Sequence, residues 1–203
     1  MFVRLGSVCT KIGSGITPRG GSSVYKTEGV ALIRSQNVLD FSFSSNGLVF
    51  ISEDIAENMK SVEVVPGDVL LNITGDSVAR SCLAPKDKLP ARVNQHVMII
   101  RADKTKLNPM YLLLVLQHRK DWLLSQSEVG ATRKALTKSL VESLEIDLPD
   151  IEHQNKISSI FQNIQQLIRT NERINDYLFD SKSSSNNAFL RFDNTRIAFP
   201  LFT

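Results

Sequence analysis

The chain has 203 residues, of which 42% are hydrophobic and 22% charged, so it can bury one core and carry an appendage. No run approaches the ~18 consecutive apolar residues of a membrane span, and the N-terminus lacks the apolar core of a signal peptide. We therefore expect a soluble, cytoplasmic protein without a membrane partner. Cys9 and Cys82 are the only cysteines and lack CxxC spacing, which argues against disulfides and a thiolate metal site.

The net charge of +3 is mild, so overall charge does not identify a nucleic-acid binder. The distribution of charge is more informative. Residues 76–106 hold seven basic and three acidic side chains, whereas residues 53–68 hold five acidic side chains and one lysine. Charge alone favours a solvated surface with two opposite patches.

Residues 1–149 are predicted to form many short strands separated by turns. The candidate strands are mostly rich in β-branched residues, and turn residues separate them. They are Val30–Arg34, Leu48–Ile51, Ser61–Val65, Val69–Ile73, Val78–Leu83, Arg92–Arg101 and Leu144–Leu148. The earlier glycine-rich stretch, Gly13–Gly21, is expected to be an irregular loop.

Three shorter helices are predicted in the same region, each opened by a capping side chain. They are Glu53–Met59 after Ser52, a helix from Pro109 through Gln126 after Asn108, and Lys138–Ser143 after Thr137. The second has a mostly apolar side, which we expect to face the core.

The longest predicted helix follows Pro149. Asp150 can accept hydrogen bonds from the first free amides of a helix that begins at Ile151. Apolar residues then recur at alternating spacings of three and four, forming a heptad seam of Ile157, Ile160, Ile164, Leu167, Asn171, Ile174 and Leu178. The seam predicts pairing with another helix, with Asn171 fixing the register. An ordinary amphipathic helix packed on its own domain stays open, because Phe161 and Ile168 widen the stripe.

These elements predict an α+β fold in three parts. Residues 1–149 form a strand-rich domain, and residues 150–180 form a long C-terminal coiled-coil helix. Residues 181–203 form a tail that is first polar and then rich in phenylalanine, whose structure the sequence leaves open.

Sequence motifs for catalysis and cofactor binding are absent. The GSGITPRGG stretch matches neither GxxxxGK[ST] nor GxGxxG, and the three histidines lack metal-ligand spacing. No serine lies in a GxSxG elbow. We therefore predict no cofactor and no metal. A hydrolase built from Asp76, Ser77 and His96 is kept as an alternative, because a triad is a spatial arrangement that sequence spacing does not exclude.

Polar side chains gather at the ends of the predicted strands. Arginine suits guanine edges, asparagine and glutamine suit adenine edges, and lysine, threonine and serine commonly hold phosphates. The residues that we expect to face DNA are Arg34, Gln36, Asn37, Thr74, Ser77, Arg80, Arg92, Asn94, Arg133 and Lys134. For any one of them, capping a turn is the competing interpretation.

A series of markers runs in order along residues 1–178. Upstream are TPRGG, LIRSQNV, PGDVLLNITGDSVAR and NQHVMIIR. Downstream are a glycine-containing loop at 130–132, a short helix, a strand ending at Pro149, an acidic helix start at 151–154 and a long helix over 156–178. In this order they resemble the specificity (S) subunit of type I restriction-modification enzymes.

The resemblance implies that residues 1–149 are a target recognition domain for double-stranded DNA and that the chain itself is not an enzyme. It implies partner subunits that carry adenine methyltransferase (M) and ATP-dependent endonuclease (R) activity. Family members usually carry two recognition domains and two spacer helices, whereas this chain has one of each. We therefore expect a homodimer that reads a symmetric split target, with a helix of about 28 residues, ~42 Å long, as the spacer. A coiled-coil adaptor that binds protein partners is the remaining alternative.

Overall fold

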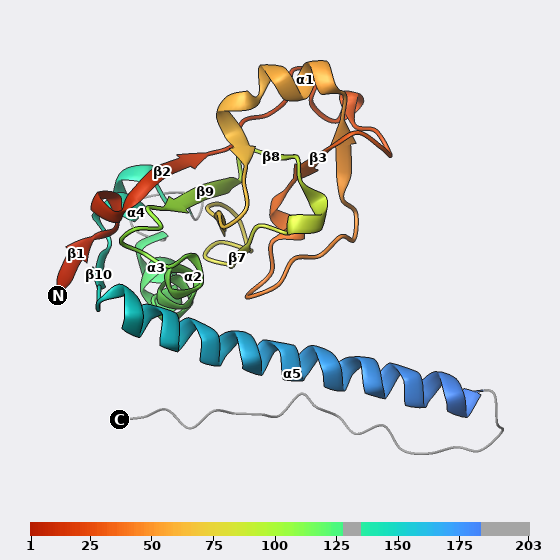
Figure 1. The fold of residues 1–203 in the computed structure, drawn as a ribbon. Helices are drawn as coiled ribbons and strands as arrows, with labels where there is room; N and C mark the ends of the chain where they lie inside the picture. Colours follow the sequence, from red (N-terminus) through yellow and green to blue (C-terminus); the bar gives the residue numbers. More distant parts are fainter. Residues whose placement is uncertain (128–134, 184–203) are drawn as a thin grey trace. The chain divides into compact units, whose positions relative to one another are not determined.

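The computed structural model describes residues 1–127 and 135–183 (Figure 1). The chain divides into two compact units, Met1–Ser159 and a second that begins at Ile160, within the last helix. The first unit combines short strands and helices, and a long helix closes the described chain, so the α+β prediction is confirmed. No described helix is long and apolar enough to span a bilayer.

Two four-stranded sheets form the centre of the first unit. One has the order β2 (Cys9–Ser14), β9 (Val97–Ala102), β6 (Val69–Asn72) and β7 (Ser81–Leu83), with every pair antiparallel. The other has the order β4 (Val49–Ile51), β3 (Val30–Ile33), β8 (Ala91–Val93) and β5 (Glu63–Val64). In this second sheet β3 and β8 run parallel, and the two outer pairs are antiparallel. Each sheet thus joins strands that lie far apart in the sequence.

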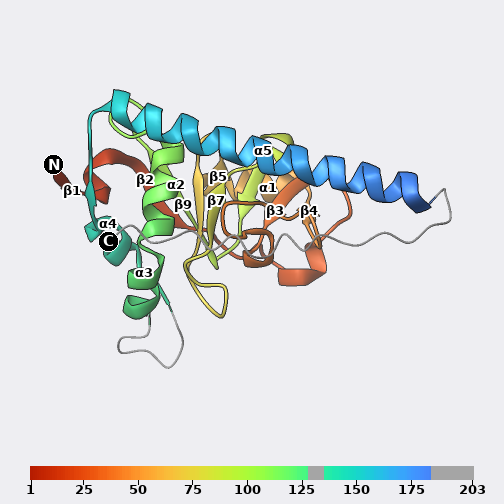
Figure 2. The ribbon, with the colours of Figure 1, turned by 90° about the horizontal axis from the view of Figure 1, so that it is seen from below.

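A third, two-stranded sheet pairs β1 (Phe2–Arg4) with β10 (Glu145–Asp147). The described helices are α1 (Glu53–Asn58), α2 (Pro109–His118), α3 (Lys120–Ser127), α4 (Lys138–Ser143) and α5 (Ile151–Ser183). Helix α2 packs on β6, β7 and β9, and α4 packs on β2 and the 3-10 turn Leu5–Val8 (Figure 2).

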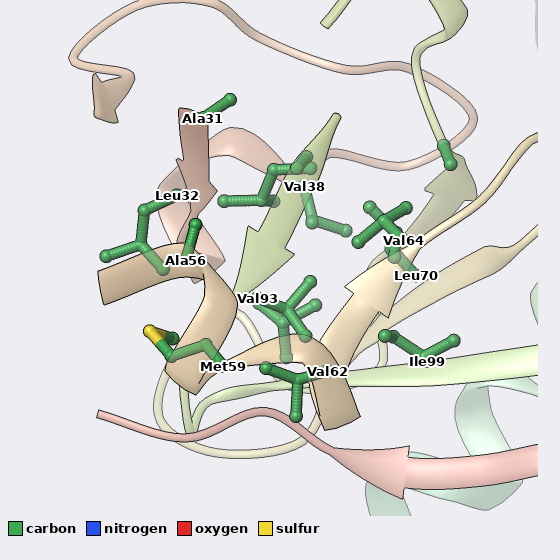
Figure 3. Close-up of a cluster of buried hydrophobic side chains, with 14 of the residues drawn as sticks. Ala31, Leu32, Val38, Ala56, Met59, Val62, Val64, Leu70, Val93 and Ile99 are labelled. Carbon is green, nitrogen blue, oxygen red and sulfur yellow. The ribbon is translucent and has the colours of Figure 1, made fainter. Parts of the chain in front are cut away.

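The hydrophobic core lies between the two larger sheets and α1 (Figure 3). Leu32 and Val93 come from one sheet, Leu70 and Ile99 from the other, and Met59 follows α1. Because side chains alternate along a strand, the intervening buried residues of β6 and β9 point to the opposite face, where α2 lies. The sheet β2-β9-β6-β7 is therefore covered on both faces. This explains why β6 consists of three consecutive apolar residues followed by the buried Asn72.

Charged side chains also connect the elements of the first unit through hydrogen bonds. Asp68, fully buried, accepts two hydrogen bonds from Arg101, at 2.7 and 2.9 Å, and one from the Val65 amide at 2.8 Å. Arg92 donates to the Ala56 carbonyl oxygen at 2.9 Å and reaches Glu63 at 3.3 Å. Burial, followed by repulsion from Arg101, lowers the pKa of neighbouring Lys11. These side-chain bonds join β8 to β5 and α1, and β9 to the turn that precedes β6.

Most predicted strands are present, but three predictions about strands are wrong. The strand expected over Val78–Leu83 begins only at Ser81, because residues 78–80 belong to a turn in which Ala79 has φ 66°. The stretch Arg92–Arg101 is two strands in different sheets, because Asn94–His96 form a turn in which the Asn94 side chain accepts from the His96 amide at 3.2 Å. The glycine-rich stretch contains the end of β2 rather than only loop. Gly15 makes the close approach possible, since a Cβ there would lie 2.2 Å from the carbonyl oxygens of Val93 and Asn94.

The predicted short helices are present with two corrections. Ser52 precedes α1, but its side chain makes no capping bond. The helix expected from Pro109 through Gln126 is divided at Arg119, whose φ and ψ of −88° and 9° end α2. The Asn108 cap is confirmed, with bonds from the amides of Met110 and Tyr111, and Thr137 caps α4.

The start of α5 is fixed within the first unit. Asp150 caps it as predicted, accepting from the His153 amide at 2.9 Å. That amide and the His153 ring hold the pKa of Asp150 below its usual value. Gln154, fully buried, accepts from the Asn108 amide at 2.9 Å and donates to the carbonyl oxygens of Lys106 and Pro149 at 3.0 and 2.8 Å. One side chain thus secures the first turn of the helix to two loops.

Candidate nucleic-acid interface

Three chain segments at strand ends bring polar side chains together in the first unit. They are the 3-10 turn Ser35–Asn37 after β3, the turn 73–80 between β6 and β7, and the turn 94–96 between β8 and β9. The turn after β6 depends on two residues with left-handed backbone, Gly75 at φ 77° and Ala79 at φ 66°. Such a conformation is uncommon in alanine and is found at sites where the surroundings hold it in place.

Asn72 is the residue that holds two of these segments together. It ends β6, is fully buried, and donates from Nδ2 to the Ser35 carbonyl oxygen at 2.9 Å and to Ser77 Oγ at 3.1 Å. A third acceptor, the Val38 carbonyl oxygen, lies at 3.3 Å. Asn72 lies within the strand predicted over Val69–Ile73, and no sequence motif signals this organising role.

The three segments surround an open hollow of about 430 Å³. Seven of its eight lining residues have polar side chains, and the lining consists of Ser35, Gln36, Thr74, Gly75, Asp76, Ser77, Arg80 and His96. Four of these, Gln36, Thr74, Ser77 and Arg80, are residues that the sequence predicts to face DNA. The hollow therefore presents hydrogen-bond donors, acceptors and a guanidinium group on one surface, as the reading of base edges requires.

Arg34 lies next to this hollow rather than in its lining. Its guanidinium stands over the Tyr25 ring, 5.4 Å from the centroid, and donates to the Gly47 carbonyl oxygen at 2.5 Å. Gln36 donates to the same oxygen at 3.1 Å. Tyr25 and the loop at Gly47 thus position two of the predicted side chains, and no sequence motif signals that contact.

The structure contradicts three of the predicted DNA-facing residues. Asn37, Arg92 and Asn94 are buried, with relative exposures of 0%, 5% and 6%. Asn37 caps its own turn, accepting from the Arg34 amide and donating to the Ser44 carbonyl oxygen, while Arg92 belongs to the charged network between strands. For these three the competing interpretation, that a polar residue at a strand end serves the fold, is the right one.

Arg133 and Lys134 lie outside the described residues. The next described residue, Ala135, is paired with Thr74 of the hollow, and the Leu136 amide donates to the Ile73 carbonyl oxygen at 2.8 Å. The chain that follows Lys134 is therefore joined to the rim of the hollow.

The arrangement does not favour a hydrolase. His96 Nδ1 lies 2.6 Å from Thr74 Oγ1, and its Nε2 lies 3.0 Å from Gln95 Nε2. Ser77 Oγ accepts from Asn72 instead. Both ring nitrogens of His96 are thus engaged by residues other than the Ser77 and Asp76 that a triad needs. Among the residues with described positions, no group of three metal-binding side chains is placed to hold an ion.

The predicted seam of α5 is exposed. The apolar members of the seam range from 39% exposed at Ile164 to 64% at Leu167. By contrast, Gln154 and Ser158 near the start of the helix are buried. The alternative of an ordinary helix packed on its own domain applies to this first stretch, whereas the apolar seam residues are exposed.

The first unit thus combines a strand-rich fold with a hollow lined by polar side chains, and a long helix with exposed apolar residues follows it in the chain. Residues 1–178 match the type I restriction modification DNA specificity domain, so the chain belongs to that family. A protein of Methanocaldococcus jannaschii assigned as the MjaX type I restriction enzyme specificity subunit is 21% identical over 146 residues. That match covers 70% of this chain and 34% of the relative.

Solved structures show the same fold. A chain from a structure of complex assembly and conformational transition in the type I R-M system has a TM-score of 0.65 at 24% identity, over 88% of this chain and 41% of that one. The HsdS subunit from Thermoanaerobacter tengcongensis has a TM-score of 0.61 at 24% identity, over 86% of this chain and 39% of that one. This chain therefore spans well under half the length of these relatives.

Proposed function

We propose that this chain is a sequence-specific DNA-binding specificity subunit that reads one half of a split double-stranded target. The observation that carries the proposal is the polar hollow at the three strand-end segments, formed within a domain of the specificity family. Gln36, Thr74, Ser77 and Arg80 are the base-facing and phosphate-facing candidates, with Arg34 beside them. Arg133 and Lys134 stay predictions from the sequence.

In this proposal the chain binds DNA without catalysing a reaction. Its partners, the methyltransferase (M) and restriction (R) subunits, carry the adenine methylation and ATP-dependent cleavage, and the complex acts in the cytoplasm. The solved relative whose title concerns complex assembly of a type I R-M system supports assembly with other subunits. The adaptor and hydrolase alternatives have no comparable support.

The proposal includes a homodimer formed through α5. The apolar seam residues are exposed, and between Ile160 and Leu178 the positions that flank them in the heptad carry no charge: Phe161, Asn163, Ile168, Thr170, Asn175 and Tyr177. The charged residues of this stretch, Arg169, Glu172, Arg173 and Asp176, fall on the opposite side of the heptad. Two identical helices therefore meet without like-charge repulsion.

A dimer of this chain would bring two strand-rich units and two long helices together. The chain spans 34–41% of the length of the relatives described above. The 33 residues of α5 correspond to ~50 Å at ~1.5 Å per residue, longer than one ~34 Å turn of duplex DNA. Two-fold symmetry then predicts an inverted repeat separated by a spacer.

Two measurements test the proposal together. Light scattering at micromolar concentration is expected to give a dimer for the wild type and for Gln166→Asp, and a monomer for Leu167→Asp, because only Leu167 lies in the seam. Selection from a random duplex library is expected to return a spaced inverted repeat with the wild type and a single half-site with Leu167→Asp. A monomeric wild type would refute the dimer, and a library without enriched sequences would refute DNA reading.

A further inference from the structure

Asp76 is the acidic side chain of the hollow. It lies on the turn between β6 and β7, beside Gly75, and a Cβ at Gly75 would meet nothing within 4 Å, so this corner projects into open space. Asp76 is exposed and, over the described stretches 1–127 and 135–183, takes part in no ion pair or side-chain hydrogen bond. Asp40 and Asp68 differ, because each holds a basic partner, Lys120 and Arg101 respectively.

The chemistry of a carboxylate limits what Asp76 can bind on DNA. A carboxylate only accepts hydrogen bonds and is negatively charged, as are the phosphate oxygens, so Asp76 does not hold the backbone. The donors on the base edges of the major groove are the amino groups of cytosine N4 and adenine N6. Carboxylates in DNA-reading surfaces characteristically accept from cytosine N4.

The neighbouring Arg80 distinguishes between the two bases. It is four residues further along the same turn and lines the same hollow. An arginine pairs with guanine O6 and N7, and guanine is the partner of cytosine. Asp76 and Arg80 together thus match the edge of a C·G pair, whereas an A·T pair offers Arg80 no O6.

We propose that Asp76 selects a cytosine in the target by accepting a hydrogen bond from its N4 amino group. This inference rests on the proposed function of the hollow as a DNA-reading surface. Asp76 then determines specificity, although its negative charge lowers the general attraction between the protein and DNA.

The test begins with selection from a random duplex library by the full chain and by three variants. Asp76→Ala and Asp76→Asn are expected to lose the preference for cytosine at one position of each half-site and to keep the remaining positions. Asp87→Ala is the matched control, because it removes an exposed carboxylate that does not line the hollow. It is expected to return the wild-type target.

A second measurement uses the wild-type chain, so it does not depend on the folding of a variant. Each cytosine of the selected target is replaced in turn by pyrimidin-2-one, which lacks the N4 amino group. One replacement is expected to weaken binding by about 5- to 150-fold, the range for one good base contact of ~1–3 kcal/mol. With Asp76→Ala the same replacement is expected to have no further effect, as in a double-mutant cycle.

The outcomes separate the inference from the proposed function. If the wild type enriches no sequence, the DNA-reading function fails and the inference fails with it. If the wild type enriches a target but Asp76→Ala keeps every preference, only the inference is overturned. A uniform gain in affinity for all sequences with Asp76→Ala also overturns it, because Asp76 would then act only by repulsion.

Discussion

Replacing Gln154 with alanine is expected to destabilise the first unit by about 3 kcal/mol. The change removes three hydrogen bonds, from the Asn108 amide and to the carbonyl oxygens of Lys106 and Pro149. A neutral hydrogen bond contributes about 0.5–1.5 kcal/mol net, which gives ~1.5–4.5 kcal/mol for three. For a domain of about 150–250 residues, each 1 kcal/mol shifts the melting temperature by ~2–4 °C, so we expect a decrease of ~6–12 °C.

Urea unfolding and thermal melting of the full chain measure this effect. Gln162→Ala is the matched control, because Gln162 is exposed on the same helix. It is expected to change the free energy of unfolding by no more than about 0.5 kcal/mol, as do most surface substitutions. Equal losses for the two variants would refute the reasoning, because alanine favours the helix at both positions and only Gln154 makes the three buried hydrogen bonds.

Three further changes have defined outcomes. Asp68→Asn leaves Arg101 without its charged partner, and because Arg101 is partly exposed we expect a loss of ~2 kcal/mol by urea unfolding, below the ~3–5 kcal/mol of a fully buried pair. Since His153 lowers the pKa of Asp150, the capping contribution is present at neutral pH and is lost as the pH falls below about 4. Asp150→Asn is therefore expected to flatten the decline in unfolding free energy at acidic pH, and a parallel decline would contradict this. Asn171→Leu is expected to lower the dissociation concentration of the dimer in sedimentation equilibrium, and a weaker dimer would contradict its place in the seam.

The elements that local patterns determine were predictable from the sequence. The Asn108 cap before Pro109, the Thr137 cap and the start of α5 after Asp150 all involve side chains that bond to backbone within a few residues. The seam of α5 was predictable for the same reason, since a helix converts sequence spacing directly into a stripe.

The elements that depend on distant partners were not predictable. Arg92–Arg101 reads as one apolar run, and only its two different sheets, β8 with β3 and β9 with β2 and β6, separate its halves. Strand β2 lacks a strong pattern of its own and owes its form to β9.

The candidate site divides in the same way. The types of residue at the strand ends pointed to the hollow, but exposure separated Gln36 and Arg80, which line it, from Asn37 and Arg92, which are buried. An arginine that reads a base and an arginine that joins two strands have the same sequence signature. Only the packing around each guanidinium distinguishes them.

The interleaved strand order has a consequence for synthesis on the ribosome. In one sheet Ala31 is paired with Ala91, and in the other Cys9 is paired with Ala102. Strands β2 to β7 therefore leave the exit tunnel before β8 and β9, which complete the two sheets. Closing loops over such long sequence separations is slow. The first unit consequently folds late and as a whole, and a nascent chain that stops before β8 contains neither complete sheet.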